Sequence, residues 1–436
     1  MPTPILTAFA GWTGDLKYIK KPELAGCAAS TAGREQPNTH SHQEDSKLKT
    51  NHLLRLLALL SGLSALANGA GRAGTASDVP SRSEGQATME HFIAAGGAGN
   101  FYGWPANNGA WTWDGGREIL VGFSYGRFVE QEGHNTFEQR DYDGLARSLD
   151  GGITWKIESS ATYVPDDSGT SPSPGGFVFD APGFAMRVKY GRFLVSQDRG
   201  KSWQGPYHFG SLTGAEELAG MRLSSRTGYV VTGRQACLIF MSAQPHGKDY
   251  ADKSFVVETT DGGRTFQFIS WIVPRDDPHR AVMPSPVRLA DGTLVVALRR
   301  RIPEVDEMCW LDCYGSSDNG RTWTFLSKIA ETGKHNGNPP ALTVLNDGRV
   351  ACAYGDRTRI KMYLRLSADG GNTWGDELVL RDDFQMDKFG ERDFGYPRLV
   401  RNDRGELVVL YYWATRECPQ QQIMATIWRP ESKQRL

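Results

Sequence analysis

The 436-residue sequence predicts an all-β protein, a six-bladed β-propeller with Asp-box repeats, and two observations lead to this fold class. First, an eight-residue pattern, S-x-D-x-G-x-T-W, occurs five times. Its copies, called Asp boxes below, are SLDGGITW at 148–155, SQDRGKSW at 196–203, TTDGGRTF at 259–266, SSDNGRTW at 316–323 and SADGGNTW at 367–374. Second, the Asp residues of successive boxes lie 48 to 63 residues apart, which is the period expected of a small sheet repeated along the chain.

The composition agrees with a β-rich fold. The chain holds 50 Gly and 12 Trp, and 39% of its residues are hydrophobic, as is typical of a turn-rich, aromatic-packed protein. Its 49 basic and 50 acidic residues leave a formal net charge of -1. Because no global field attracts nucleic acid or an anionic membrane, we expect neither as a partner, and any site for an anion must be local.

The residues between the boxes define one repeated unit. A run rich in Val, Leu and aromatics precedes each of the later boxes, and LVVALRRR at 294–301 is an example. An Asp-Gly turn, ADGTL at 290–294, stands before that run, and a shorter strand containing Pro, MPSPVRL at 283–289, stands before the turn. The unit is therefore strand, turn, strand, loop, strand, Asp box, strand, which is the antiparallel four-stranded meander of a propeller blade.

Counting such units predicts six blades. They lie near 108–160, 177–210, 226–272, 284–330, 339–381 and 397–429. The last unit has no Asp box, and HFIAAGG at 91–97 can supply its closing strand. A closed ring has no exposed sheet edge, which is why we favour it. A sandwich of two stacked sheets is the alternative.

The Asp box itself is expected to lock a turn. Its Gly adopts the positive φ of a tight turn, and its Asp accepts hydrogen bonds from N–H groups of the same turn. Thr favours the strand, and the Trp ring fills the space between neighbouring blades. We therefore do not expect the box aspartates to be catalytic.

The N-terminal part differs from the propeller, which is expected to span 88–430. Residues 1–47 are polar and without pattern, and we interpret them as a disordered extension or as the product of a misassigned start site. In the segment 48–75, basic residues precede an apolar run that ends at Ala65-Leu66-Ala67. That layout is typical of a signal peptide, and the run is too short for a membrane span. A signal peptide predicts a secreted or periplasmic protein. The alternative is that the segment forms a short amphipathic helix in an ordinary N-terminal extension.

The order of turns predicts where a ligand binds. A meander places alternate turns on opposite faces, so the Asp-Gly turns and the Asp boxes share one face. The other face gathers the loops between strands two and three and the starts of the first strands. It carries GWPANNG at 103–109, the insertion at 125–143, RRR at 299–301, GNPP at 337–340, GDRTR at 355–359 and DFGYPR at 393–398.

Arginines recur on this predicted ligand face. They are Arg127, Arg300, Arg301, Arg357, Arg359 and Arg398. A planar guanidinium pairs bidentately with a carboxylate, so we expect a ligand that carries one. The alternative is that these arginines pair with nearby aspartates, for which Asp306, Asp356 and Asp393 are available.

Other candidate site residues lie on the same face. Tyr396 is placed near the mouth of the ring, where it can act as a nucleophile or a hydrogen-bond donor, activated by a carboxylate such as Asp393. His134 lies in the longest insertion, and long loops on a rigid ring are often functional. Amide groups and a stacking plane suited to a sugar come from Trp104, Asn107, Asn108 and Asn338. The alternative is that these residues have structural roles only: His134 as a surface residue, Tyr396 as a packed side chain, and the GWP sequence as a corner of the chain.

Five Asp boxes on such a ring resemble the sialidase (neuraminidase) superfamily, also called BNR-repeat proteins, over residues 90 to about 430. The chain is also similar to sialidase-like secreted bacterial proteins that share GWPANNG, LARSLDGG, MPSPVRL, RRR, GNPPAL and GYPR. In sialidases, an Arg triad holds the sugar carboxylate, a Tyr activated by Glu attacks the anomeric carbon, and an Asp is the acid/base. The resemblance implies that Tyr396 is the nucleophile and that Arg357 or Arg359 belongs to the triad.

Three functional hypotheses follow. The first is an exo-acting glycoside hydrolase that removes a terminal acidic sugar, sialic acid or a uronic acid. The second is a lyase that cleaves a uronide, with His134 and Tyr396 as base and acid. The third is a glycan-binding propeller without activity, which is favoured by GWPANNG standing where sialidases carry F-R-I-P. We expect an acidic glycan as partner, a monomer, no cofactor, and no metal, since no ligand-rich calcium loop is present.

Overall fold

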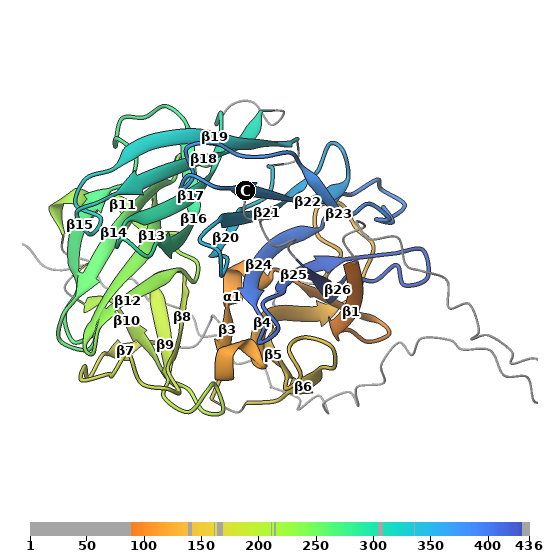
Figure 1. The fold of residues 1–436 in the computed structure, drawn as a ribbon, viewed down its shortest axis with the longest axis horizontal. Coiled ribbons are helices and arrows are strands. Elements are labelled where there is room, and N and C mark those ends of the chain that lie inside the picture. The colour runs from red at the N-terminus through yellow and green to blue at the C-terminus, as the bar shows by residue number, and fades with distance from the viewer. Residues whose placement is uncertain are drawn as a thin grey trace, which may run out of the picture. The chain divides into compact units, whose positions relative to one another are not determined.

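The computed structural model describes residues 89–137, 142–160, 162–163, 169–210, 212, 215–303, 308–334 and 336–429. The predicted extension at 1–47 and signal-like segment at 48–75 lie outside the described residues. The described chain folds into six β-sheets of four or five strands each, arranged around a ring (Figure 1). The predicted six-bladed β-propeller is confirmed, and the alternative of two stacked sheets is wrong.

The strands follow the order of the blades along the chain. The first blade holds β2 (Asn100–Gly103), β3 (Ala110–Trp113), β4 (Glu118–Arg127), β5 (Tyr142–Ser148) and β6 (Lys156–Glu158). The second holds β7 (Ser171–Pro172), β8 (Ala185–Lys189), β9 (Arg192–Ser196) and β10 (Gln204–His208). The third holds β11 (Met221–Leu223), β12 (Tyr229–Gly233), β13 (Ala236–Pro245), β14 (Lys253–Thr259) and β15 (Gln267–Trp271).

The remaining blades are simpler. The fourth holds β16 (Arg280–Arg288), β17 (Leu294–Arg301), β18 (Cys309–Ser316) and β19 (Thr324–Gly333). The fifth holds β20 (Ala341–Val344), β21 (Val350–Asp356), β22 (Lys361–Ser367) and β23 (Leu378–Arg381). The sixth holds β24 (Gly395–Arg401), β25 (Leu407–Trp413) and β26 (Gln422–Trp428), and β1 (Met89–Ala95) completes it. The described helices are single turns, α1 (Pro105–Asn108), η1 (Asp114–Gly116) and η4 (Glu216–Leu218), so none of them could cross a bilayer.

The second blade departs from the expected meander. Its order is β7-β10-β9-β8, and β7 pairs with β10 in parallel. Since β7 precedes β8 in the chain, the connection from the first blade contributes this outer strand, and only β8 to β10 form an antiparallel meander.

The ring closes through strands from the two ends of the propeller. Strand β1 pairs antiparallel with β26, in a register that sets Met89 opposite Trp428 and Phe92 opposite Ala425. The closing strand expected at 91–97 is therefore confirmed. Ala94 lies in the apolar seam that this pairing forms with the first blade. Closure covers the outer edge of β26, which would otherwise expose unpaired backbone groups.

The central strands are apolar on both sides because each blade packs between two others. In β17, Val295 and Ala297 belong to the core shared with the fifth blade. Leu294, Val296 and Leu298 belong to the core shared with the third blade. Successive side chains of a strand point to opposite faces, so a strand buried on both faces is a continuous apolar run.

The Asp boxes lock turns, as predicted. In the first box, the Asp150 carboxylate accepts a hydrogen bond from the Thr154 backbone at 2.9 Å and one from its hydroxyl at 2.6 Å. Gly152 has a φ of 98°, and Trp155 donates its indole N–H to the Gly152 carbonyl. The fourth box repeats these bonds at Asp318 and places its Trp against the preceding blade, where Trp323 donates to Ser270.

Candidate functional site

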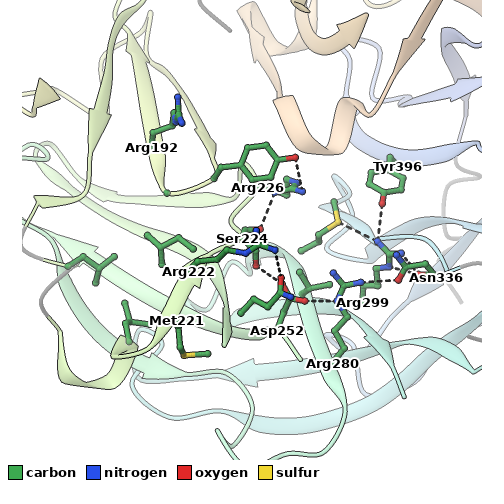
Figure 2. A pocket seen from close by; sticks show the side chains of 18 residues that line it. Arg192, Met221, Arg222, Ser224, Arg226, Asp252, Arg280, Arg299, Asn336 and Tyr396 are labelled. Atoms are coloured by element: carbon green, nitrogen blue, oxygen red, sulfur yellow. Dashed lines mark hydrogen bonds and ion pairs between the residues drawn. The ribbon is translucent and has the colours of Figure 1, made fainter. Parts of the chain in front are cut away.

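A cavity of about 810 Å³ lies on the face of the propeller opposite the Asp boxes (Figure 2). This placement follows from register, since Leu294 at one end of β17 lies opposite the box residue Ser316, whereas Arg299 near the other end lines the cavity. The polar lining residues are Tyr190, Arg192, Arg222, Ser224, Arg226, Gln244, Asp252, Arg280, Arg299, Asn336 and Tyr396. They come from blades two, three, four and six and from the loop between blades four and five.

The cavity is strongly basic although the whole chain is nearly neutral. Five arginines line it, and Asp252 is the one carboxylate among the described lining residues. Asp252 is buried, accepts a hydrogen bond from Ser224, and pairs with Arg280 at 2.7 Å. One arginine of the five is thus neutralised by that carboxylate.

Three other arginines of the cavity bind oxygen atoms that do not belong to carboxylates. Arg222 donates to the side-chain oxygen of Gln244 at 3.0 Å, and Arg226 donates to that of Asn107 at 2.7 Å. Arg299, which is 2% exposed, donates to the carbonyl of Asn336 and to the hydroxyl of Tyr396. Positive charge that no carboxylate offsets makes the cavity suited to an anionic ligand.

Tyr396 stands at the wall of this cavity in an unusual backbone conformation. Its φ is 47°, in the left-handed region, and Gly395 before it has a φ of 100°. Asn338 holds this turn from the neighbouring loop, because its side chain accepts the Tyr396 N–H at 2.7 Å and donates to the Phe394 carbonyl at 3.1 Å. A side chain held in strained backbone at a cavity indicates function.

The charges around Tyr396 acidify its phenol. Burial alone would raise the pKa of this hydroxyl, but the nearby charges of Arg299 and Arg357 outweigh burial and lower the pKa of Tyr396 to about 7. Arg299 donates to the hydroxyl at 3.0 Å, and the Arg357 guanidinium lies 5.8 Å from the ring centroid. A large fraction of the phenol is therefore ionised at neutral pH, as a nucleophile or base requires.

His134 and Asp393 form an ion pair beside Tyr396. The Nδ1 atom of His134 lies 3.0 Å from a carboxylate oxygen of Asp393. The negative charge of Asp393 raises the pKa of His134 to about 9, against the opposing effect of burial. Asp393 is buried and also accepts hydrogen bonds from Tyr412 and Arg357. The imidazole is therefore protonated at neutral pH while 43% of its side chain stays exposed.

Several of the predicted site residues gather in this one place. Tyr396, His134, Asp393, Arg357 and Asn338 form the network described above. The ring of Trp104 packs edge-on against His134, with centroids 4.9 Å apart. Arg357 is buried and is not among the residues that line the cavity, and its guanidinium lies near the ring of Tyr396.

The two predicted asparagines of the first blade, Asn107 and Asn108, are buried and are not among the residues that line the cavity. They belong to α1, which sits near the middle of the ring and is fully buried (Figure 1). Asn107 orients Arg226, and Asn108 binds Arg187 and Ser124. Asn107 therefore holds one of the cavity arginines, whereas Asn108 binds residues outside the cavity lining.

The structure places the remaining predicted arginines elsewhere, and Arg127 lies over the ring of Phe137, 4.4 Å from its centroid. Arg398 is held under α1, where it donates to the backbone carbonyls of Ala106 and Thr227. Arg359 pairs with Glu377 and Asp356 on the fifth blade, as the local-pairing alternative predicted. Arg300 pairs with Asp277 and Asp312, and Arg301 stacks on Tyr250 at 3.9 Å, so neither is among the cavity-lining residues.

None of the five arginines of the cavity was among the predicted site residues. They are Arg192, Arg222, Arg226, Arg280 and Arg299. For Arg299 a signal existed, because it shares the face of β17 with Val295 and Ala297, whereas Arg300 points to the opposite face. Arg226 stands just before β12 and Arg280 begins β16, and these are strand starts of the kind that singled out Tyr396.

In the part of the chain that the structure describes, no group of three or more His, Cys, Asp or Glu side chains could hold a metal ion.

Comparison with known proteins identifies the repeats. The family model described as "BNR repeat-like domain" matches residues 177–409, more than half of the chain. No curated protein matches.

Solved structures share the fold at low sequence identity. A Dyadobacter fermentans protein of unknown function is 20% identical with a TM-score of 0.59, covering 78% of this chain and 98% of that one. A Penicillium chrysogenum α-L-arabinanase complexed with arabinobiose is 14% identical with a TM-score of 0.50, covering 77% and 98%. A mutant Trypanosoma rangeli sialidase displaying trans-sialidase activity is 14% identical with a TM-score of 0.47, covering 74% and 53%. Because the family model spans more than half of the chain, the chain belongs to the family of BNR repeat-like domains.

Proposed function

We propose that the protein is an exo-acting glycosidase that removes a terminal acidic sugar, sialic acid or a uronic acid, from a glycan. One observation carries the proposal: Tyr396, with a pKa of about 7, stands at the wall of a cavity lined by five arginines. An acidified phenol supplies a nucleophile, and guanidinium groups supply the partners of a sugar carboxylate.

The substrate class has two kinds of support. The basic cavity favours an anionic ligand, although the chain as a whole has a net charge of -1. A carbohydrate is favoured by the arabinanase neighbour, which is complexed with arabinobiose. The export expected from residues 48–75 and the monomeric state stay predictions.

In the proposed reaction, Arg299 and Arg280 hold the carboxylate of the terminal sugar. The phenolate of Tyr396 attacks the anomeric carbon, so that a bond from this carbon to the phenol oxygen forms as the glycosidic bond breaks. The protonated imidazole of His134 donates its proton to the leaving oxygen. Water then displaces the phenolate, and neutral His134 accepts the proton that water loses.

A second reaction is favoured by the partner of Tyr396. Among the described residues, its hydroxyl is hydrogen-bonded to Arg299 and not to a carboxylate. A phenolate stabilised by arginine can also act as a base toward the carbon next to a uronate carboxylate, with His134 protonating the leaving oxygen. That elimination would leave an unsaturated sugar that absorbs ultraviolet light.

The test is incubation of the protein with sialosides and with oligosaccharides that end in a uronic acid, measuring free sugar and ultraviolet absorbance together. We expect turnover by the wild type and a loss of at least about a hundredfold for Tyr396→Phe. Tyr207→Phe, on the outer strand β10, is the matched control. A product that absorbs ultraviolet light would show that the reaction is elimination and not hydrolysis. Glycan binding without turnover of any substrate would contradict both and leave a binding protein.

A further inference from the structure

We propose that the cavity contains a second anion-binding subsite, formed by Arg222 and Arg226, and that its ligand is an oligosaccharide with at least two anionic substituents. One substituent would lie beside Tyr396 and Arg299, and the other beside Arg222 and Arg226. The second is a carboxylate or a sulfate on a neighbouring sugar ring. This inference rests on the proposed function for the assignment of the first sugar.

The two groups of side chains lie apart in the cavity. Figure 2 shows Arg222 and Arg226 on one side, Tyr396 with Arg299 on the other, and Asp252 with Arg280 between them. The volume of about 810 Å³ is in the upper part of the range of roughly 300–1,000 Å³ that small-molecule sites occupy. A cavity of this size accommodates more than one sugar ring.

Arg222 has the features of a ligand-binding group. Its side chain is exposed to the cavity from β11, and it donates to the side-chain oxygen of Gln244 at 3.0 Å. The Gln244 amide nitrogen donates to Lys248 and Asp249, which fixes the amide with its oxygen toward Arg222. A guanidinium carries five N–H donors, so this one neutral partner leaves most of them for an oxyanion.

Arg226 is held rigidly next to it. Its guanidinium lies 4.2 Å from the ring centroid of Tyr190 and donates to Asn107 and to the carbonyls of Ser224 and Ser225. All of these acceptors are neutral. A fixed charge costs little ordering when a ligand binds, so Arg226 adds a preorganised positive potential to the subsite.

The distribution of charge favours a second anion. Asp252 neutralises Arg280, and the phenolate of Tyr396 faces Arg299 and Arg357. Neither Arg222 nor Arg226 forms an ion pair with a carboxylate among the described residues. A ligand with one carboxylate at Tyr396 would leave both charges without an anionic partner.

Binding measurements test the subsite directly. The probes are trigalacturonic acid, its methyl ester, a sulfated neutral trisaccharide and free glucuronic acid, titrated calorimetrically into the wild type and Arg222→Gln. The control is Arg321→Gln, which removes the same charge from an exposed residue of an Asp box on the other face. Arg222 is exposed, so we expect both variants to unfold at the temperature of the wild type.

We expect at least one anionic trisaccharide to bind Arg222→Gln about tenfold or more weakly than wild type and Arg321→Gln. Free glucuronic acid should bind all three proteins equally. The weakened probe identifies the anion, a uronate carboxylate or a sulfate. Three results would overturn the subsite. The two anionic trisaccharides could bind Arg222→Gln as tightly as they bind the wild type, or the methyl ester could lose as much affinity as they do. Alternatively, neither anionic trisaccharide could bind the wild type.

Failure of the proposed function gives a different result. If Tyr396→Phe keeps wild-type turnover, the catalytic role of Tyr396 is wrong, whereas the effect of Arg222 on binding stands. If Tyr396→Phe is inactive but Arg222→Gln binds both trisaccharides like the wild type, the second subsite is wrong and the glycosidase proposal stands.

Discussion

Tyr396 combines a strained backbone with a shifted pKa. A tyrosine in the left-handed region costs about 1–3 kcal/mol, and the two hydrogen bonds of Asn338 and the arginines around the phenol hold it there. The same arginines that hold the ring in place stabilise its ionised form. Position and reactivity therefore have one electrostatic cause.

The ionisation of Tyr396 is directly measurable. With a pKa of about 7, its phenolate should appear in the ultraviolet difference spectrum as pH rises through neutrality. That transition should be missing in Tyr396→Phe and retained in Tyr207→Phe, because burial raises the pKa of Tyr207. A neutral-pH transition that survives in Tyr396→Phe would show that another group titrates there.

Activity should follow the two shifted groups together. If phenolate Tyr396 and protonated His134 both act, kcat/KM should rise through about pH 7 and fall again above about pH 9. The falling limb should disappear in His134→Gln, since no imidazole remains to lose its proton. A rate that keeps rising above pH 9 in the wild type would contradict the acid role of His134.

The His134–Asp393 pair also predicts how stability depends on pH. The folded pKa of His134 is raised from 6.5 to about 9, so its contribution to stability is fully present below pH 6.5 and is lost as pH rises through 9. The unfolding free energy of wild type minus that of His134→Gln should therefore decrease between these pH values in urea titrations. A constant difference would mean that the ion pair does not stabilise the fold.

At the scale of the element, irregular inner strands mark the site. In the first and third blades, single long strands, β4 and β13, each pair with two short ones, and the interruptions carry α1 and Arg226. In β16 and β24 the register shifts at Met283 and Tyr396, both with positive φ. Bulges often re-aim side chains next to active sites, and here the shifts in β16 and β24 place Met283 and Tyr396 in the lining of the cavity.

The fifth blade offers a matched pair of glycines, one in its Asp box and one in its Asp-Gly turn. Gly371 in the fifth box has a φ of 99°, and a Cβ there would lie 2.7 Å from the Cys313 sulfur. Gly348 in the Asp-Gly turn of the same blade has a φ of 85° and open space around it. Gly348→Ala should cost about 1–2 kcal/mol through strain, and Gly371→Ala about 1–3 kcal/mol more through overpacking. Chemical denaturation measures the unfolding free energy of both variants. A larger loss for Gly348→Ala than for Gly371→Ala would refute this prediction.

At the scale of the whole molecule, stability depends on the seam where β1 meets β26. Ala94 is buried in that seam, whereas its neighbour Ile93 is 43% exposed. A carboxylate at position 94 would be buried among apolar side chains, so Ala94→Glu should lower the unfolding free energy by about 3 kcal/mol or more. Ile93→Glu should have a small effect. Thermal unfolding of the two variants compares them, and equal losses would mean that the seam is not essential.

The fold was predictable from local patterns. Each Asp box is a self-contained set of hydrogen bonds, so its five copies and the apolar runs between them predict blades wherever they occur. The parallel strand β7 was not predictable, because its two residues carry no pattern and pair only through the path of the connection. The sixth blade has no Asp box, but it was recognised because a turn similar to the Asp-Gly turns, DRGEL at 403–407, connects two of its strands.

The site was predictable only in part. Tyr396, His134 and Asp393 lie together because the predicted ligand face gathers the segments that carry them. The roles of the arginines, in contrast, depend on the direction of each side chain. Arg299 and Arg300 are adjacent in sequence, and yet one lines the cavity while the other pairs with Asp277. Arg222 lies in the short strand β11 and Arg226 in the interruption that follows it, and neither segment has a motif of its own.

By itself the sequence determined the six blades, the turn-locking role of the Asp boxes and the face on which a ligand binds, because these depend on local hydrogen bonding and strand alternation. Only the tertiary structure decided which arginines share a cavity and which are neutralised by carboxylates. Closing the ring brings Tyr396 of the sixth blade next to Arg299 of the fourth, 97 residues earlier in the chain. The pKa of Tyr396 is a consequence of that proximity, since charges act through space and not along the sequence.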